Sequence, residues 1–164
     1  MRKMNCDTAN KMVRRLQADL QALINKEAST CTYSYLADED PLVPEYDFHR
    51  TQDEIAGYTK KIVALKHAIN QFNTSTEITE LGLTIDGALV RMAILNNEKT
   101  RLDRMRNVQE MTRATTLRGV AEYTKRNYDV SDVEKRYQEV CDEIMSIQQG
   151  INMANLVRTF EVDI

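Results

Sequence analysis

The sequence predicts a mainly α-helical fold: long antiparallel helical hairpins forming a four-helix, coiled-coil-like bundle with a small two-stranded β accessory. The 164 residues include only 5 Gly and 2 Pro, and residues that favour helices dominate the long segments. Apolar residues recur in four segments at alternating spacings of three and four, which is a seven-residue repeat. A chain of this length predicts a single helical domain, 1–164.

The repeats predict four helices, at about 7–28, 47–72, 85–112 and 132–154. Asp7 and Thr84 are expected to cap the first and third helices, because their side-chain oxygens can accept hydrogen bonds from free backbone N–H groups. Ser131 and Glu134 form a capping-box pattern before the fourth helix. Gly57 lies inside the second helix, where it predicts the close approach of another backbone.

The apolar stripe of the third helix becomes polar at Glu98 and Lys99. We favour the interpretation that the helix leaves the core there, because burying a charge without a partner is costly. The alternative is a half-buried polar layer that fixes the register or the oligomeric state.

Other segments are predicted as loops and strands. An acidic loop covers 29–46 and contains both prolines. A polar connector, 69–91, joins the second and third helices. Strands are expected at about 120–128 and 156–163, where Val, Tyr and Thr are frequent or apolar residues alternate. Because a lone strand is not stable, these two should pair with each other or with a copy in another subunit.

The net charge, the cysteine content and the length of the apolar runs argue against several classes of protein. The net charge of −3 does not favour general attraction to nucleic acid or to anionic lipid. Three widely spaced cysteines without a CxxC motif argue against a disulfide framework and a zinc cluster. No apolar run approaches the roughly 18 residues of a membrane span, and the N-terminus lacks the apolar region of a signal peptide. We therefore expect a cytoplasmic protein with no membrane partner.

Several short motifs of the second half resemble a family of small uncharacterised bacterial helical proteins, some of which are labelled septicolysin. The shared residues are Ile69, Asn70, Asn73, Gly82, Thr84, Ile85, Ala88, Leu89, Arg91, Glu122, Asp129, Val130, Ile151, Ala154 and Asn155. The resemblance covers roughly 69–164 and implies a helical bacterial protein without an established activity. The chain departs from the family pattern at two positions: Leu156 stands where an aromatic residue is expected, and Met92 stands where a charged residue is common.

Two groups of residues are candidate sites. The polar turn residues could form a ligand pocket at a helix N-terminus, or could only satisfy the backbone of the turn: Asn70, Asn73, Thr76, Thr84 and Asp86. The basic residues could form an interaction face: Lys99, Arg101, Arg104, Arg106, Arg113 and Arg118. His49, with Glu45 and Asp53 at four-residue spacing, lies off the apolar stripe, so a solvated face is the favoured interpretation over a metal site.

No catalytic or cofactor-binding motif is identifiable, so neither enzymatic activity nor a cofactor is expected. The favoured hypothesis is a non-catalytic helical scaffold or protein-interaction module that self-associates as a homo-oligomer. One alternative is a nucleic-acid-associated accessory protein that uses the basic face Lys99–Arg118, against which the acidic net charge argues. Another is a metal- or ligand-binding bundle protein.

Overall fold

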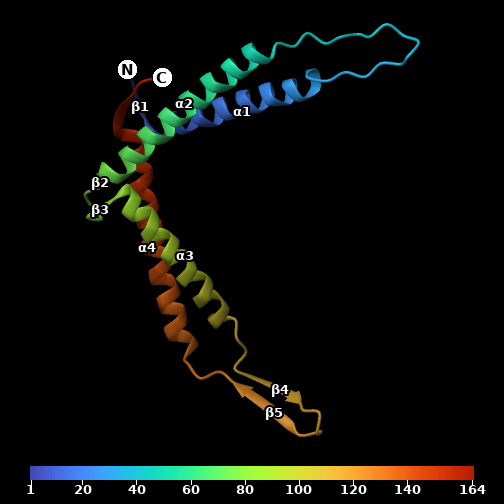
Figure 1. Ribbon diagram of the computed structural model, residues 1–164. Helices are drawn as coiled ribbons and strands as arrows, with labels where there is room; N and C mark the ends of the chain where they lie inside the picture. Colours follow the sequence, from blue (N-terminus) through green and yellow to red (C-terminus); the bar gives the residue numbers. More distant parts are fainter. The chain divides into compact units, whose positions relative to one another are not determined.

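The computed structural model describes all residues, 1–164, and contains four helices and three small two-stranded sheets (Figure 1). The predicted mainly helical class is therefore confirmed. The residues group into two compact units. Unit 1 comprises Met1–Thr76 and Met153–Ile164, and unit 2 comprises Glu77–Asn152.

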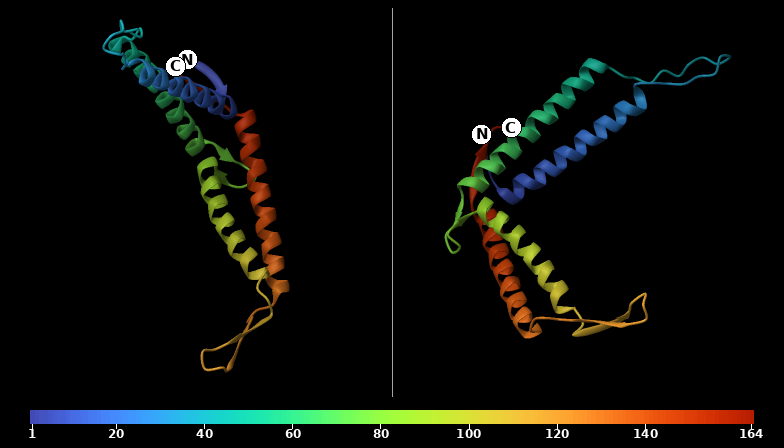
Figure 2. Two further views of the ribbon diagram at one scale, coloured as in Figure 1. Left: turned by 90° about the vertical axis from the view of Figure 1, so that its right-hand side faces the viewer. Right: turned by 60° about the horizontal axis from the view of Figure 1, so that its bottom comes forward.

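Unit 1 is built on a helical hairpin of α1 (Cys6–Thr30) and α2 (Phe48–Ser75). The right view in Figure 2 shows the two helices running side by side, and they contact each other. The predicted stripes meet along the seam, where the core consists of apolar side chains that include Ala9, Val13, Leu16, Ile62, Leu65 and Ile69. The apolar seam does not extend to the loop: Phe48, the first residue of α2, is 56 % exposed.

The base of this hairpin is closed by a sheet that joins the two ends of the chain. Strand β1 (Arg2–Asn5) pairs antiparallel with β6 (Thr159–Val162). Phe160 of β6 packs on Phe72 of α2, with 5.1 Å between the ring centroids. The prediction that the C-terminal strand pairs with 120–128 was wrong, because the N-terminal strand lies beside it instead.

Two predicted helix starts were also wrong. Asn5, not Asp7, caps α1: its side chain accepts a hydrogen bond from the backbone N–H of Thr8 at 2.9 Å. Helix α4 (Val130–Val157) begins before the predicted capping box of Ser131. There the Asp129 carboxylate accepts the Ser131 backbone N–H at 2.8 Å. In both cases an Asx residue that favours capping lies nearer the true helix start.

Unit 2 contains α3 (Ile85–Arg106) and most of α4, antiparallel to each other. Three ion pairs define the register: Arg91 with Glu143, Glu98 with Arg136, and Arg106 with Glu134. Apolar side chains that include Leu95, Leu102, Val140 and Ile147 are buried in this unit.

The predicted polar connector contains a small hairpin. Strand β2 (Glu77–Ile78) pairs with β3 (Leu83–Thr84), and Gly82 between them has a φ of +62°. Thr84 caps α3 as predicted, since its hydroxyl accepts the Gly87 N–H at 3.1 Å.

Helix α3 ends at Arg106, six residues before the predicted end at Thr112. The following residues form β4 (Met111–Thr115), which pairs with β5 (Ala121–Lys125) across a turn where Gly119 has a φ of +75°. The predicted strand at 120–128 exists in part, but its partner is the neighbouring segment β4, whose first two residues, Met111 and Thr112, were predicted as the end of a helix. Residues rich in Thr on both sides of a glycine turn favour such a hairpin.

Candidate functional site

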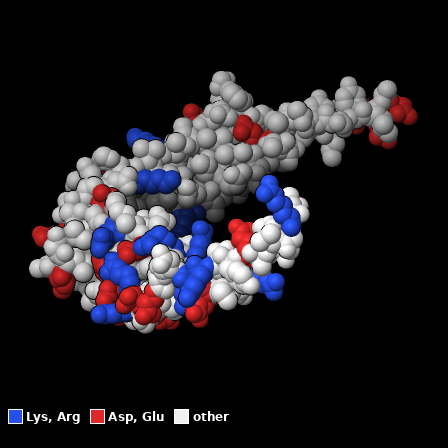
Figure 3. Space-filling model, turned by 90° about the horizontal axis from the view of Figure 1, so that it is seen from below, with Lys and Arg blue, Asp and Glu red and all other residues white.

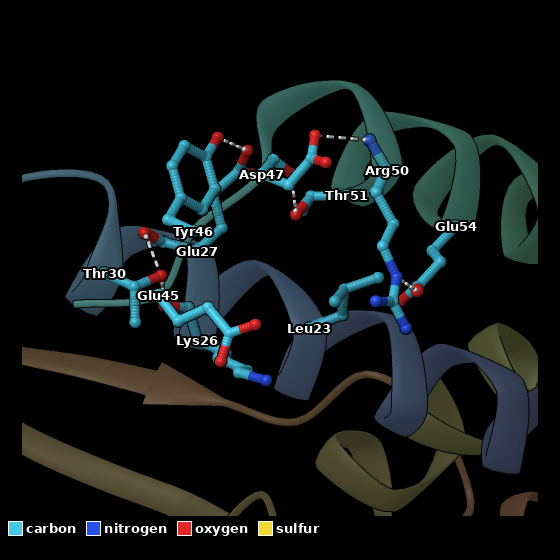
Figure 4. Close-up of a pocket in the computed structure, with 10 residues that line it drawn as sticks. All are labelled: Leu23, Lys26, Glu27, Thr30, Glu45, Tyr46, Asp47, Arg50, Thr51 and Glu54. Atoms are coloured by element: carbon cyan, nitrogen blue, oxygen red, sulfur yellow. Dashed lines mark hydrogen bonds and ion pairs between the residues drawn. The ribbon is translucent and has the colours of Figure 1, made fainter.

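A polar cleft of about 250 Å³ lies in unit 1, where the end of α1, the end of the loop and the start of α2 come together (Figure 4). Ten residues line it: Leu23, Lys26, Glu27, Thr30, Glu45, Tyr46, Asp47, Arg50, Thr51 and Glu54. The sequence did not predict this cleft, because its residues come from three segments that only the hairpin brings together.

The N-cap of α2 and the half-buried carboxylate of Glu27 hold the residues of the cleft in place. Asp47 caps α2, and its carboxylate accepts the backbone N–H of Arg50 at 3.1 Å. Glu27 of α1 accepts two hydrogen bonds on one oxygen, from the Tyr46 hydroxyl at 2.9 Å and from the Gln52 amide at 2.8 Å. Glu27 therefore ties the end of the loop and the first turns of α2 to α1.

The charges of the cleft are mixed and partly paired. The Arg50 guanidinium lies 3.2 Å from the Glu54 carboxylate. Figure 4 marks this ion pair with a dashed line. Burial raises the pKa of Tyr46 to about 12, and its hydrogen bond to Glu27 acts in the same direction. Tyr46 therefore keeps its proton well above neutral pH, and it donates that proton to the Glu27 carboxylate.

The predicted polar turn residues fall in both units. Asn70, Asn73 and Thr76 belong to unit 1, whereas Thr84 and Asp86 belong to unit 2. Thr76 is buried, and its N–H donates to the Phe72 carbonyl at 2.9 Å. This bond and the cap made by Thr84 satisfy backbone groups, as the plainer interpretation expects.

Two amide oxygens in unit 1 lack a hydrogen-bond partner. They are the Oδ1 atoms of Asn73 and Asn155, and both are shielded from solvent. Asn73 was a predicted turn residue, whereas Asn155 had been noted only for the family resemblance. Buried polar atoms of this kind normally find a partner.

The predicted basic face is broken up by local pairing. The Arg106 guanidinium lies 4.2 Å from the centre of the Tyr137 ring and 3.0 Å from the Asp103 carboxylate. Lys99 also lies over Tyr137, at 5.9 Å. Figure 3 shows basic and acidic side chains intermixed on the face of unit 2 that it presents.

The remaining basic residues lie on different elements. Arg101 donates to the Met105 sulfur at 3.4 Å, and Arg104 lies exposed on the same helix. Arg113 is on β4, with its guanidinium 5.9 Å from the Tyr123 ring, and Arg118 is in the turn after β4. The six residues therefore belong to a helix and a hairpin rather than to one helical face.

The polar interruption of α3 at Glu98 lies in the contact between α3 and α4. Glu98 is 24 % exposed and accepts a hydrogen bond from Arg136 of α4 at 2.9 Å. Arg136 also bonds Glu139 at 3.2 Å. The Arg136 hydrogen bond holds the pKa of Glu98 below its ordinary value. The favoured prediction that the helix leaves the core at this point was wrong, since Leu102 beyond it is 4 % exposed.

No three His, Cys, Asp or Glu side chains converge in a geometry that could hold a metal ion. His49 instead lies edge-on to the Phe48 ring, with 5.5 Å between the ring centroids. None of the four helices has the length and apolar character needed to span a membrane.

The chain is thus a helical-hairpin protein with a polar cleft beside the loop that joins α1 and α2. No family model and no curated protein match the chain. A similar solved structure is that of a functionally unknown conserved protein from Corynebacterium diphtheriae, 18 % identical, with a TM-score of 0.67 over 98 % of this chain and 100 % of that one. At this identity the likeness shows the fold alone, and membership of the septicolysin-like family stays a prediction.

Proposed function

We propose that this protein is a non-catalytic helical scaffold that binds other protein chains, first of all a second copy of itself. The observation that carries the proposal is a set of exposed apolar side chains at helical spacing on faces away from the buried seams. Such faces on a helix pair would be covered by further helices, giving a coiled-coil-like bundle.

The first of these faces is on α3. Val90 and Ile94 are 57 % and 54 % exposed and are one helical turn apart. The buried residues of the same helix, Ala88, Leu95 and Leu102, follow the opposite stripe. Single exposed apolar residues are common on any protein, but neighbours on one face more often mark an interaction site.

The second face is at the end of α4, in unit 1. Met153, Leu156 and Val157 are 62 %, 57 % and 70 % exposed. They follow the spacing of three and four residues that places side chains on one face of a helix. Leu156 is also one of the two positions at which the chain departs from the resembled family.

The energetic effect of covering the α3 face can be estimated. Full burial of a Val or Ile side chain stabilises by roughly 1.5–3 kcal/mol, so burying the exposed half contributes about 1 kcal/mol. A two-fold interface uses both residues twice, which gives about 4 kcal/mol, or about a thousandfold in the dissociation constant.

The test is the self-association of Val90→Glu/Ile94→Glu, measured by light scattering and sedimentation. Val63→Glu is the matched control: Val63 is 61 % exposed on α2, and its neighbours at three and four residues are Thr59, Lys60, Lys66 and His67. We expect the double variant to dissociate and the control to associate like the wild type. A wild type that stays monomeric at concentrations on the order of 100 μM would contradict the proposal.

A further inference from the structure

The β4–β5 hairpin of unit 2 has open edges. It is a two-stranded sheet, and all its residues except the half-buried Ala121 are exposed. Backbone bonds from Arg126 to Glu110 and from Thr116 to Val120 bracket the ladder. By alternation, the backbone groups of Met111, Arg113 and Thr115 point outward on the free edge of β4. An isolated two-stranded hairpin is only marginally stable, and a third strand would complete it.

One face of this hairpin is basic and aromatic. Arg113 pairs across the ladder with Tyr123, and Met111 pairs with Lys125, so all four side chains are on the same face. Arg118 lies in the connecting turn, which also exposes Leu117 and Val120. The hairpin therefore offers positive charge and apolar surface beside its free backbone groups.

The loop between α1 and α2 has complementary properties. Residues 31–47 contain five carboxylates, of Asp38, Glu39, Asp40, Glu45 and Asp47, and no Lys or Arg. The segment before the carboxylates, 32–36, is exposed, and its first four residues alternate Thr or Ser with Tyr, a composition that favours strands. Between residues 32 and 46 the loop has one backbone–backbone hydrogen bond, from Glu39 to Leu36.

We infer that segment 32–36 of one copy adds a strand to the free edge of β4 in a second copy, while Asp38, Glu39 and Asp40 face Arg113, Arg118 and Lys125. Strand addition supplies the backbone hydrogen bonds, and the opposite charges supply the register and the choice of partner. Tyr33 and Tyr35, which are stacked at 6.1 Å and exposed, would cover apolar surface of the hairpin.

A second copy is the occupant because every chain carries both elements. Two chains can therefore exchange loops symmetrically and form the contact twice. The hydrogen bonds of the loop all lie within unit 1 and those of the hairpin within unit 2, so both elements keep free groups. This inference rests on the proposed function, since it too has the chain bind its own copy, but it uses different residues from the helix faces.

Two charge-reversed proteins test the inference. The loop variant carries Asp38→Lys, Glu39→Lys and Asp40→Lys, and the hairpin variant carries Arg113→Glu, Arg118→Glu and Lys125→Glu. All six positions are exposed, so circular dichroism should show the wild-type helix content. We expect each variant alone to dimerise more weakly by on the order of a hundredfold, because like charges then face each other.

Mixing the two variants distinguishes exchange between copies from docking within one chain. In the mixture the basic loop of one variant meets the acidic hairpin of the other, and both contacts are attractive again. We expect sedimentation and native mass spectrometry to show heterodimers with near wild-type affinity. Contacts within one chain could not be restored by mixing, so a mixture that stays dissociated would overturn the inference.

The control reverses three exposed carboxylates elsewhere, Asp19→Lys, Glu80→Lys and Glu161→Lys, and should leave dimerisation unchanged. If the helix-face variant dissociates while both charge-reversed variants remain associated, the proposed function stands and this inference fails. Duplex DNA bound by the wild type and released by the hairpin variant, with no change in dimerisation, would assign the hairpin to nucleic acid and overturn the inference as well.

Discussion

Two glycines inside long helices should respond differently to alanine. Gly57 is in α2 and Gly150 is in α4, and glycine in a helix interior costs about 1 kcal/mol relative to alanine. A Cβ added at Gly57 would meet no atom within 4 Å. A Cβ at Gly150 would lie 2.9 Å from Cγ2 of Ile78 and 3.3 Å from Cδ1 of Leu81.

Gly57→Ala is therefore expected to raise the free energy of unfolding by about 1 kcal/mol. In Gly150→Ala the same gain is opposed by overpacking, which costs about 1–3 kcal/mol, because Ile78 is 3 % exposed and has little room to move. The two variants should differ by about 2 kcal/mol, with Gly150→Ala no more stable than the wild type.

Urea unfolding followed by far-UV circular dichroism measures both effects. With m-values of about 1–3 kcal/mol per molar urea, a gain of about 1 kcal/mol moves the midpoint upward by about 0.5 M. A lower midpoint for Gly57→Ala would mean that another backbone approaches this glycine, as the sequence had suggested, and would refute the argument from open space. Equal stabilisation by the two variants would refute the assigned contact between Gly150 and Ile78.

Three further predictions concern the core, the polar layer and the cleft. Leu95→Ala removes a fully buried side chain and should cost about 2–5 kcal/mol by urea unfolding, whereas Leu36→Ala, in the exposed loop, should change stability by no more than about 0.5 kcal/mol. The pKa of Glu98 is lowered by Arg136, so its contribution to stability is present above its ordinary pKa of 4.5 and is lost as the pH falls through the lower folded value. Glu98→Gln should therefore lose less stability than the wild type on acidification, and equal losses would contradict the pairing. Subtracting the spectrophotometric titration curve of Tyr46→Phe from that of the wild type should show a phenol with a pKa of about 12 instead of 10. A pKa of 10 for this phenol would exclude the bond from Tyr46 to Glu27.

The helices could be predicted from the sequence because their signal is local. The stripe from Ile55 to Phe72 repeats without interruption, and its later members, from Ile62 to Phe72, form the buried seam of α2. The cap at Thr84 was predictable for the same reason, since a side-chain oxygen and the N–H that it accepts are three residues apart.

The strand pairings could not be predicted in this way. Strand β6 pairs with a segment at the opposite end of the chain, and β1 is only four residues long. Met105 and Val108 continued the apolar stripe of α3, which concealed the start of a Thr-rich hairpin a few residues later. Helical periodicity carries no information about which strand lies beside which.

The candidate cleft was missed for a related reason. Tyr46 and Asp47 lie at the end of the predicted loop, and Glu27 lies at the end of the first helix. Nothing in their spacing along the chain shows that the Tyr46 hydroxyl and the Glu27 carboxylate come within 2.9 Å. Within the predicted polar turn, in contrast, Thr84 caps α3 and the Thr76 N–H closes the end of α2, whereas the Asn73 amide oxygen has no partner.

At Glu98, the expected free-energy cost of burying a charge led to the wrong prediction that the helix leaves the core. A half-buried charge does need a partner, and the partner of Glu98, Arg136, is 38 residues away on α4. With Arg136 present, a half-buried carboxylate can remain in the seam while the helix continues to Leu102. Arg91 with Glu143 and Arg106 with Glu134 repeat the pairing on either side. A shift of α4 by one turn would separate all three pairs at once, so the layer favours this register over its neighbours more strongly than three exposed ion pairs would stabilise the fold.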